Sequence, residues 1–306
     1  MFKKIFTPNF KAYTVSNLVA LGIIAISKYF SERMTGPREN LVFSEFIIIP
    51  MLMGIISAWF WRKSDLSGKQ IMGKSFLNGC LAILLSSIFL REGVICLIIV
   101  SPLLFVSIIV GALIGRAMFR RLNNRINSSV IGLLLTVFMT DSLSEHHYEN
   151  MVSDTIIVKA TPDKIWKNVV AFKRIKEKNN FWLFKMGLPS PVESTVEGYY
   201  PGAKRKCIFS NGYTFDEKIV TYDENKNLTF AITDQPRDPE IMGHLDLKQG
   251  QFLLKDNGNG TTTLIGNSWY KLYVFPTWYY DTWAQSIVRN VHLRVMAHIK
   301  ELSETR

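Results

Sequence analysis

The chain has 306 residues, of which 48% are hydrophobic, and carries 36 Lys and Arg against 25 Asp and Glu, a formal net charge of +11. A basic balance of this size can indicate nucleic-acid binding, but most of the excess lies in short loops between apolar runs, where it sets membrane orientation. We therefore expect no nucleic-acid partner. Three scattered cysteines, Cys80, Cys96 and Cys207, resemble neither a disulfide framework nor a metal cluster.

Long apolar runs dominate the first half of the chain. Four of them approach the roughly 20 residues that a helix needs to cross a bilayer, and a fifth is shorter, with polar ends. The predicted spans are 12–30, 41–61, 75–90, 94–115 and 127–143. The pattern predicts a transmembrane helical domain over residues 1–145. A cleavable signal peptide fits poorly, because three strong spans follow the first.

Basic residues are unevenly shared between the two sides of these spans. One side carries Lys3, Lys4, Lys11, Arg62, Lys63, Lys69, Lys74, Arg116, Arg120, Arg121 and Arg125. The other side carries Lys28, Arg33, Arg38 and Arg91. This asymmetry predicts a cytoplasmic N-terminus in the cell (inner) membrane. Five spans would place the second half outside the cytoplasm and four would keep it inside; we expect five, because 131–139 is too apolar to be left exposed.

Ionisable residues are scarce within the spans. Glu45 lies near one end of the second span and is interpreted as an interfacial acid. Without a ladder of such residues, transport is not predicted. The linker residues His146, His147 and Glu149 could bind a metal, but no further ligand follows at a recognisable spacing. We predict a polar linker and no metal.

Residues 151–306 have the pattern of a water-soluble α+β domain. A strand at 155–158 precedes a helix that begins at Thr161-Pro162-Asp163, which supplies a capping hydroxyl, a first-turn proline and an acid. Residues 181–202 are interpreted as irregular chain. Alternating residues and turn-forming sequences then predict an antiparallel meander with strands at 203–210, 213–222, 227–233, 244–255 and 261–274. The basic run Lys204-Arg205-Lys206 is interpreted as a solvated strand end.

The chain closes with a predicted amphipathic helix over 276–303. Its apolar stripe consists of Tyr280, Trp283, Ile287, Val288, Val291, Val295 and Ile299. A curved antiparallel sheet with a long terminal helix lying across it is a helix-grip architecture. Because such a sheet cannot fill its own concavity, this architecture favours an internal apolar pocket.

Residues 151–304 resemble the START-like (SRPBCC) superfamily of polyketide cyclases, dehydrases and lipid-transfer proteins, in particular a membrane-tethered bacterial branch. The resemblance is carried by Ala160 to Pro162, Ile165, Trp166, Gly187 to Pro191, Cys207 to Gly212, Gln235, Pro236, Gly250 to Phe252, Gly260, Thr262, Leu264, Trp269, Tyr270, Pro276, Tyr279, Trp283, His292, Val295 and His298 to Lys300. It implies a deep apolar cavity and a ligand such as a lipid, a sterol-like molecule or a polyketide. It implies no reaction, since the superfamily includes both carriers and enzymes.

The candidate ligand-binding residues are those expected to line this cavity. They are Phe209, Phe215, Glu217, Phe230, Phe252, Trp269, Trp283, Ile287 and His292. Glu217 shares a strand face with Phe215 and could point inward, or outward into solvent. His292 flanks the helix stripe and could reach the cavity, or could be a structural histidine. The aromatic residues of the last strand and helix could be core, pocket wall, or both.

The sequence therefore predicts a membrane-anchored START-like domain that binds an apolar small molecule or lipid, without catalysis. The first alternative is an enzyme of the polyketide cyclase or dehydrase type, acting on a cyclic apolar substrate, with His292 and Glu217 as acid and base. The second is a partner-binding module with an exposed apolar patch. No cofactor is expected, because the sequence has no glycine-rich phosphate-binding loop.

Overall fold

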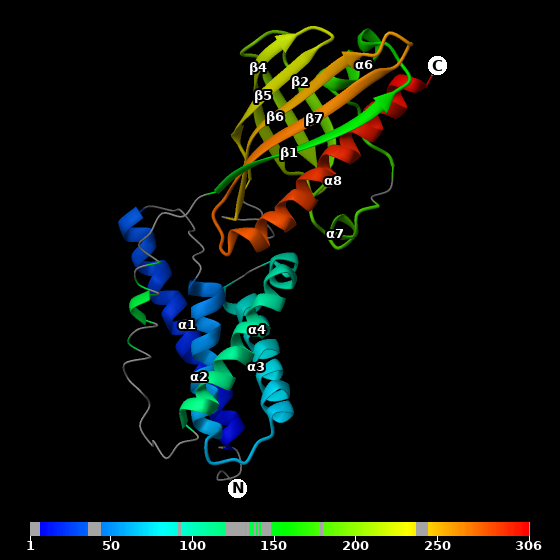
Figure 1. Cartoon of the computed structure of the whole chain (residues 1–306). Coiled ribbons are helices and arrows are strands. Elements are labelled where there is room, and N and C mark those ends of the chain that lie inside the picture. The colour runs from blue at the N-terminus through cyan, green and yellow to red at the C-terminus, as the bar shows by residue number, and fades with distance from the viewer. Residues whose placement is uncertain are drawn as a thin grey trace. The chain divides into compact units, whose positions relative to one another are not determined.

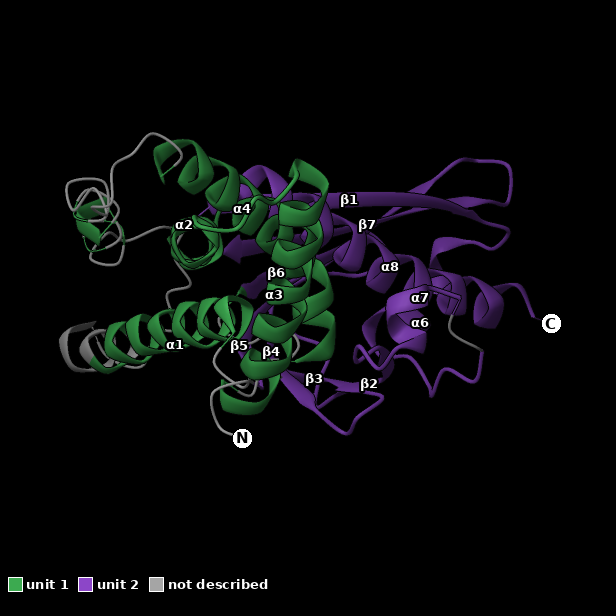
Figure 2. Ribbon diagram, turned by 90° about the horizontal axis from the view of Figure 1, so that it is seen from below, with its two compact units in different colours: residues 1–146, 239–244, 273–276 green, residues 147–238, 245–272, 277–306 purple. Residues whose placement is uncertain are grey.

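The computed structural model describes residues 7–35, 44–90, 93–119, 148–177, 180–236 and 244–305, together with scattered positions between 132 and 141. Figure 1 shows the whole chain. It divides into two compact units, coloured separately in Figure 2. The first unit comprises residues 1–146, with the short segments 239–244 and 273–276; the second comprises the remainder.

The described part of the first unit is helical. Its elements are α1 (Pro8–Thr35), a π-helical turn η2 (Ser44–Ile48), α2 (Ile49–Trp61), α3 (Gly68–Phe89) and α4 (Val94–Phe119). Four helical segments here are long and apolar enough to cross a membrane: Pro8–Ser27, Ser44–Trp61, Gly68–Phe89 and Val94–Phe119. They correspond to the first four predicted spans. The predicted fifth, 127–143, lies mostly outside the described residues, as do His146 and His147 of the linker.

Glycines allow α2 and α4 to pack backbone to backbone. A Cβ added to Gly54 would collide with the backbone oxygen of Ile108, and one added to Gly111 would collide with the backbone oxygen of Met51. Small residues at such crossings are a usual means of helix association in membranes, where burying apolar surface provides no driving force. The backbones of α2 and α4 are therefore in direct contact at these glycines.

The second unit contains an antiparallel sheet of seven strands, in the order β1-β7-β6-β5-β4-β3-β2. The strands are β1 (Tyr148–Val158), β2 (Pro191–Val196), β3 (Lys204–Phe209), β4 (Thr214–Asp223), β5 (Asn227–Asp234), β6 (Leu245–Asp256) and β7 (Thr262–Leu272). The helices are α6 (Pro162–Val170), α7 (Trp182–Lys185) and α8 (Thr277–Glu304). The predicted fold class, an apolar helical region followed by a helix-grip domain, is confirmed.

Two strands differ from the prediction. The first strand begins at Tyr148 rather than Thr155, because its N-terminal half, residues 148–154, pairs with residues 266–272 of β7. The segment 181–202, interpreted as irregular, contains the short helix α7 and the edge strand β2. Pro191 opens β2 at the edge of the sheet, a position where the missing amide hydrogen costs no ladder bond. β1 pairs with β7, which is distant in sequence, whereas β2 pairs with β3, the next strand along the chain.

The sheet curves around α8, which contacts both of its edge strands. His292 of α8 lies 3.1 Å from Asp154 of β1, whereas Arg294 of α8 donates from Nε to the carbonyl oxygen of Pro191 in β2, at 3.1 Å. The two strands stand at opposite ends of the strand order, so a flat sheet could not bring both to one helix. Figure 1 shows α8 running along the sheet. A hydrophobic core lies between α8 and the sheet, and residues of α6 also contribute to it. Its members include Ile165, Leu264 and Met296.

Candidate functional site

The inner face of the sheet brings together most of the candidate ligand-binding residues. Phe209 and Phe215 are buried with ring centroids 4.5 Å apart, and Phe230 and Phe252 are buried with centroids 6.3 Å apart. These four come from β3, β4, β5 and β6. Alternation along each strand explains their common direction. They form two aromatic pairs on the concave side.

The helix α8 presents the opposing candidate residues. Trp283 and Ile287 are half-buried, and the ring of Trp283 lies 6.4 Å from that of Trp182 in α7. His292, five residues after Ile287, is buried. The half-buried Trp283 and Ile287 provide apolar contact area on α8 that a ligand could reach.

Trp269 does not join this group. The buried side chains of β7 occupy the even positions, including Leu264, Tyr270 and Leu272. Trp269 is an odd position that pairs with the exposed Met151 of β1, so it lies on the convex face. Its expected place in the pocket wall is therefore corrected: an aromatic next to an inward position of a strand points outward.

Glu217 points inward and forms an ion pair with Arg205 inside the domain, and both side chains are at most 5% exposed. Arg205 also donates from Nε to the carbonyl oxygen of Val170 at 3.0 Å, and its guanidinium lies 4.5 Å from the centre of the Phe230 ring. Burial raises the pKa of Glu217, and the charge and hydrogen bond of Arg205 act in the opposite direction. The pair therefore places a fixed dipole among the buried apolar side chains of the inner face.

The basic run Lys204-Arg205-Lys206 predicts a solvated strand end, and for Arg205 this prediction is wrong. The two lysines do face outward, while Arg205 shares its face with Phe209. The alternation of inward and outward positions along β3 predicts that Arg205 points inward. Cys207 belongs to the same strand, and burial raises the pKa of its thiol to about 12, so it stays protonated and is a poor nucleophile at neutral pH.

His292 lies at the centre of a second polar cluster. Its Nε2 lies 2.7 Å from Ser268 Oγ, its Nδ1 lies 3.1 Å from Asp154 Oδ2, and Arg289 Nε lies 2.9 Å from the other oxygen of that carboxylate. Burial lowers the pKa of His292, while Asp154 opposes the shift. A neutral imidazole can donate from Nδ1 to Asp154 and accept at Nε2 from Ser268. The ring is thus oriented as a base would be.

Neither Asp154 nor Ser268 was expected near His292. They lie on β1 and β7, which are adjacent in the sheet although more than 100 residues apart in sequence. Asp154 lies on the same inward face of β1 as Val152 and Val158. The predicted strand, 155–158, begins after Asp154 and so does not include it. A longer first strand would have revealed the inward acid.

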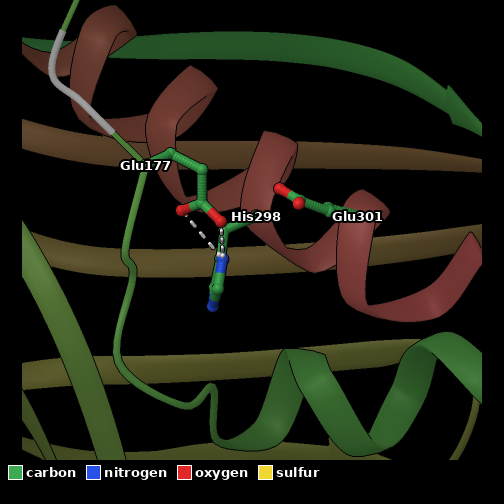
Figure 3. A group of neighbouring side chains, drawn as sticks. All are labelled: Glu177, His298 and Glu301. Carbon is green, nitrogen blue, oxygen red and sulfur yellow. Dashed lines mark hydrogen bonds and ion pairs between the residues drawn. The ribbon is translucent and has the colours of Figure 1, made fainter. Parts of the chain in front are cut away.

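His298 belongs to a third cluster, shown in Figure 3 with Glu177 and Glu301. Their potential ligand atoms lie within 4.8 Å of one another, close enough to surround a metal ion. His298 Nδ1 lies 3.2 Å from Glu177, and its Nε2 lies 2.9 Å from the carbonyl oxygen of Lys173. Glu301 is exposed, and the neighbouring Glu177 raises its pKa. These contacts link the segment before α7 to α8. The two histidines of α8, His292 and His298, belong to separate clusters.

No family model matches the chain, and no curated protein matches it either. Similar solved structures include a truncated norcoclaurine synthase from Thalictrum flavum, at 10% identity and a TM-score of 0.37, covering 53% of this chain and 98% of that chain. They also include Ara h 8.0201, at 13% identity and a TM-score of 0.35, covering 51% and 98%. A protein of Nitrosospira multiformis matches at 16% identity and a TM-score of 0.33, covering 50% and 94%. The fold of the second unit is established by its own strand order and terminal helix.

Proposed function

We propose that the chain is a membrane-anchored START-like protein whose second unit binds an apolar small molecule or lipid between the sheet and α8. The observation that carries the proposal is the two aromatic pairs of Phe209, Phe215, Phe230 and Phe252, which face a helix with two half-buried apolar side chains. Ligand sites are typically apolar with a few well-placed polar groups. The inner face of the sheet has both properties.

The two polar clusters would fix the orientation of the ligand. Arg205 and Glu217 supply a buried dipole, and Ser268 with His292 supplies a hydroxyl and a ring nitrogen. A ligand with one polar end and an apolar body would gain from both kinds of contact. Purely apolar core packing does not account for four ionisable groups, Asp154, Arg205, Glu217 and His292, which are each at most 5% exposed.

The four apolar helices of the first unit support the anchor, because each is long and apolar enough to cross a membrane. The excess of basic residues around them favours a cytoplasmic N-terminus in the cell (inner) membrane, with the second unit outside the cytoplasm if a fifth span is present. Tethering would raise the effective concentration of a bilayer-derived ligand at the domain.

Mass spectrometry of full-length protein purified in mild detergent tests the proposal. We expect a stoichiometric apolar ligand with the wild type and with Trp269→Ala, whose side chain lies on the convex face. Ile287→Trp adds bulk to the half-buried face of α8 and is expected to reduce bound ligand at least tenfold. Equal ligand in the wild type and Ile287→Trp, or no ligand in the wild type, would contradict the proposal.

A second candidate function is that of an enzyme of the cyclase or dehydrase type. The observation that favours it is the placement of His292 between Asp154 and Ser268, which orients a neutral imidazole for proton abstraction. Glu217 is committed to Arg205, so His292 is the better candidate base. Deuterium exchange next to the carbonyl of an apolar cyclic ketone, followed by mass spectrometry, should slow at least 100-fold in His292→Gln. An unchanged exchange rate would exclude this function.

A further inference from the structure

A separate pocket of about 210 Å³ lies within the first unit, at the ends of α2 and α4 and the loop that leads to α3. It is lined by Ala58, Trp61, Arg62, Lys63, Ser64, Asp65, Leu66, Ile71, Arg116 and Phe119. Three of these residues are basic and one is acidic, so the lining carries a net positive charge. The remaining large side chains of the lining, Trp61, Leu66, Ile71 and Phe119, are apolar.

Arg62 has an unused hydrogen-bond donor at this pocket. Its Nη1 donates to the carbonyl oxygen of Trp59 at 2.7 Å, and its guanidinium carbon lies 3.9 Å from the centre of the Trp59 ring. Its Nε is buried without a hydrogen-bond partner among the described residues. A buried donor without an acceptor is costly, and a charged one more so. An anion in the pocket would relieve that cost.

The simplest alternative is that the basic residues only compensate the negative C-terminal ends of two helices. That effect accounts for one cation near each end, such as Arg116 in the last turn of α4. It does not account for Lys63 beyond the end of α2, for a buried Nε of Arg62 that has no partner in the described part of the chain, or for the half-open pocket between them. The combination is suited to a ligand with an anionic head and an apolar continuation.

We propose that this pocket binds the phosphate-bearing headgroup of an anionic bilayer lipid. Arginine pairs with phosphate through parallel N–H···O bonds, and basic pockets between membrane helices bind such headgroups. Leu66, Ile71 and Phe119 would contact the glycerol region and the first carbons of the acyl chains. This inference rests on the membrane embedding of the first unit, but not on the ligand proposed for the second.

Native mass spectrometry of the full-length protein, stripped of lipid in detergent, tests the inference. The protein is titrated with dioctanoyl phosphatidylglycerol, with dioctanoyl phosphatidylcholine and with glycerol 3-phosphate. We expect the anionic lipid to bind more tightly than the zwitterionic one. Each basic side chain at a membrane surface contributes about fivefold, so the double variant Arg62→Gln/Arg116→Gln should weaken anionic lipid binding about 30-fold.

The matched control is Lys11→Gln/Lys69→Gln, which removes two exposed lysines at the same end of the helices without touching the pocket. This control variant should leave the binding of anionic lipid unchanged. Comparing the two double variants shows whether the net charge of the protein alone determines the affinity. Equal binding of the two lipids, or equal effects of the two double variants, would overturn the inference. Binding of glycerol 3-phosphate as tight as that of the lipid would reassign the pocket to a soluble phosphate.

The outcome is separable from that for the second unit. Arg62→Gln/Arg116→Gln should retain the apolar ligand that Ile287→Trp loses, and Ile287→Trp should retain anionic lipid. A common loss of both ligands in a variant that still elutes as a monodisperse species would overturn the inference, because it requires independent sites.

Discussion

In the first unit the described buried polar side chains are neutral, whereas in the second many are ionisable. The first unit buries serines and asparagines: Asn78 Nδ2 lies 3.1 Å from Ser16 Oγ and 3.2 Å from Ser57 Oγ, and its Oδ1 accepts from Asn17 at 2.8 Å. The second unit buries Asp154, Arg205, Glu217, His292 and His298. Neutral groups satisfy one another across membrane helices at low cost, whereas charges need the partners that a sheet in water can supply.

The largest expected effect comes from breaking the buried ion pair. Arg205→Met leaves Glu217 buried without its counter-charge, which should lower the free energy of unfolding by about 3–5 kcal/mol. Urea titration of the full chain in detergent, followed by thiol labelling at Cys207 and peptide mass spectrometry, reports the unfolding of this unit.

The neighbouring strand position provides the matched control. Lys206 and Asp216 form a 3.7 Å pair on the outer face, with both side chains about half exposed. Lys206→Met should cost less than about 1 kcal/mol. The double variant Arg205→Met/Glu217→Met should recover much of the loss, because no unpaired charge remains. If Arg205→Met and Lys206→Met cost the same, the buried charges of the second unit have no special role.

The reverse exchange should be harmful in the first unit. Asn78→Asp keeps the size of the side chain but introduces a carboxylate among α1, α2 and α3, at an expected cost of about 3 kcal/mol. Asn78→Leu, which removes only hydrogen bonds, should cost about 1 kcal/mol. Thermal unfolding in detergent measures both. Tolerance of the carboxylate would indicate that water reaches the helical interior, and would end the contrast between the units.

A smaller loss of stability is expected from removing a hydrogen bond that links α8 to the sheet. The Tyr270 hydroxyl donates to Asp281 Oδ1 at 2.5 Å, and burial together with that carboxylate raises the pKa of Tyr270. Tyr270→Phe should cost about 2 kcal/mol, since it removes a hydrogen bond to a charged acceptor. Tyr199→Phe is the control: its side chain is 67% exposed and should change stability by less than about 0.5 kcal/mol. The same urea titration distinguishes the two.

The smallest effect is a pH dependence. Burial lowers the pKa of His292 below its ordinary value of 6.5, so unfolding must take up a proton once the pH falls below that value. The stability from a neutral His292 is therefore present above about pH 6.5 and lost as the pH falls, by at most about 1.4 kcal/mol per pH unit. His292→Gln should flatten the decline in unfolding temperature between about pH 7 and pH 5. A parallel decline in both proteins would mean that His292 is already protonated in the fold.

Much of the architecture was predictable, because local periodicity carries it. Runs of apolar residues predict the four apolar helices. Alternation or helical periodicity within each element predicts the meander from β3 to β7 and the terminal helix. The inward direction of Phe209, Phe215, Phe230 and Phe252 follows from the same alternation. Trp269 points outward because the parity of its strand, and not its place among neighbouring aromatic residues, sets the direction of its side chain.

The polar partners were not predictable in the same way. Arg205 meets Glu217 through the register of β3 and β4, and His292 meets Asp154 and Ser268 only because β1 pairs with β7 under α8. The pocket at Arg62 likewise needs the ends of α2 and α4 side by side. The amino-acid sequence by itself determined which segments are apolar, which alternate and where basic residues gather. Only the tertiary structure decided which charges face one another, because strand register and sheet curvature join residues that no local pattern connects.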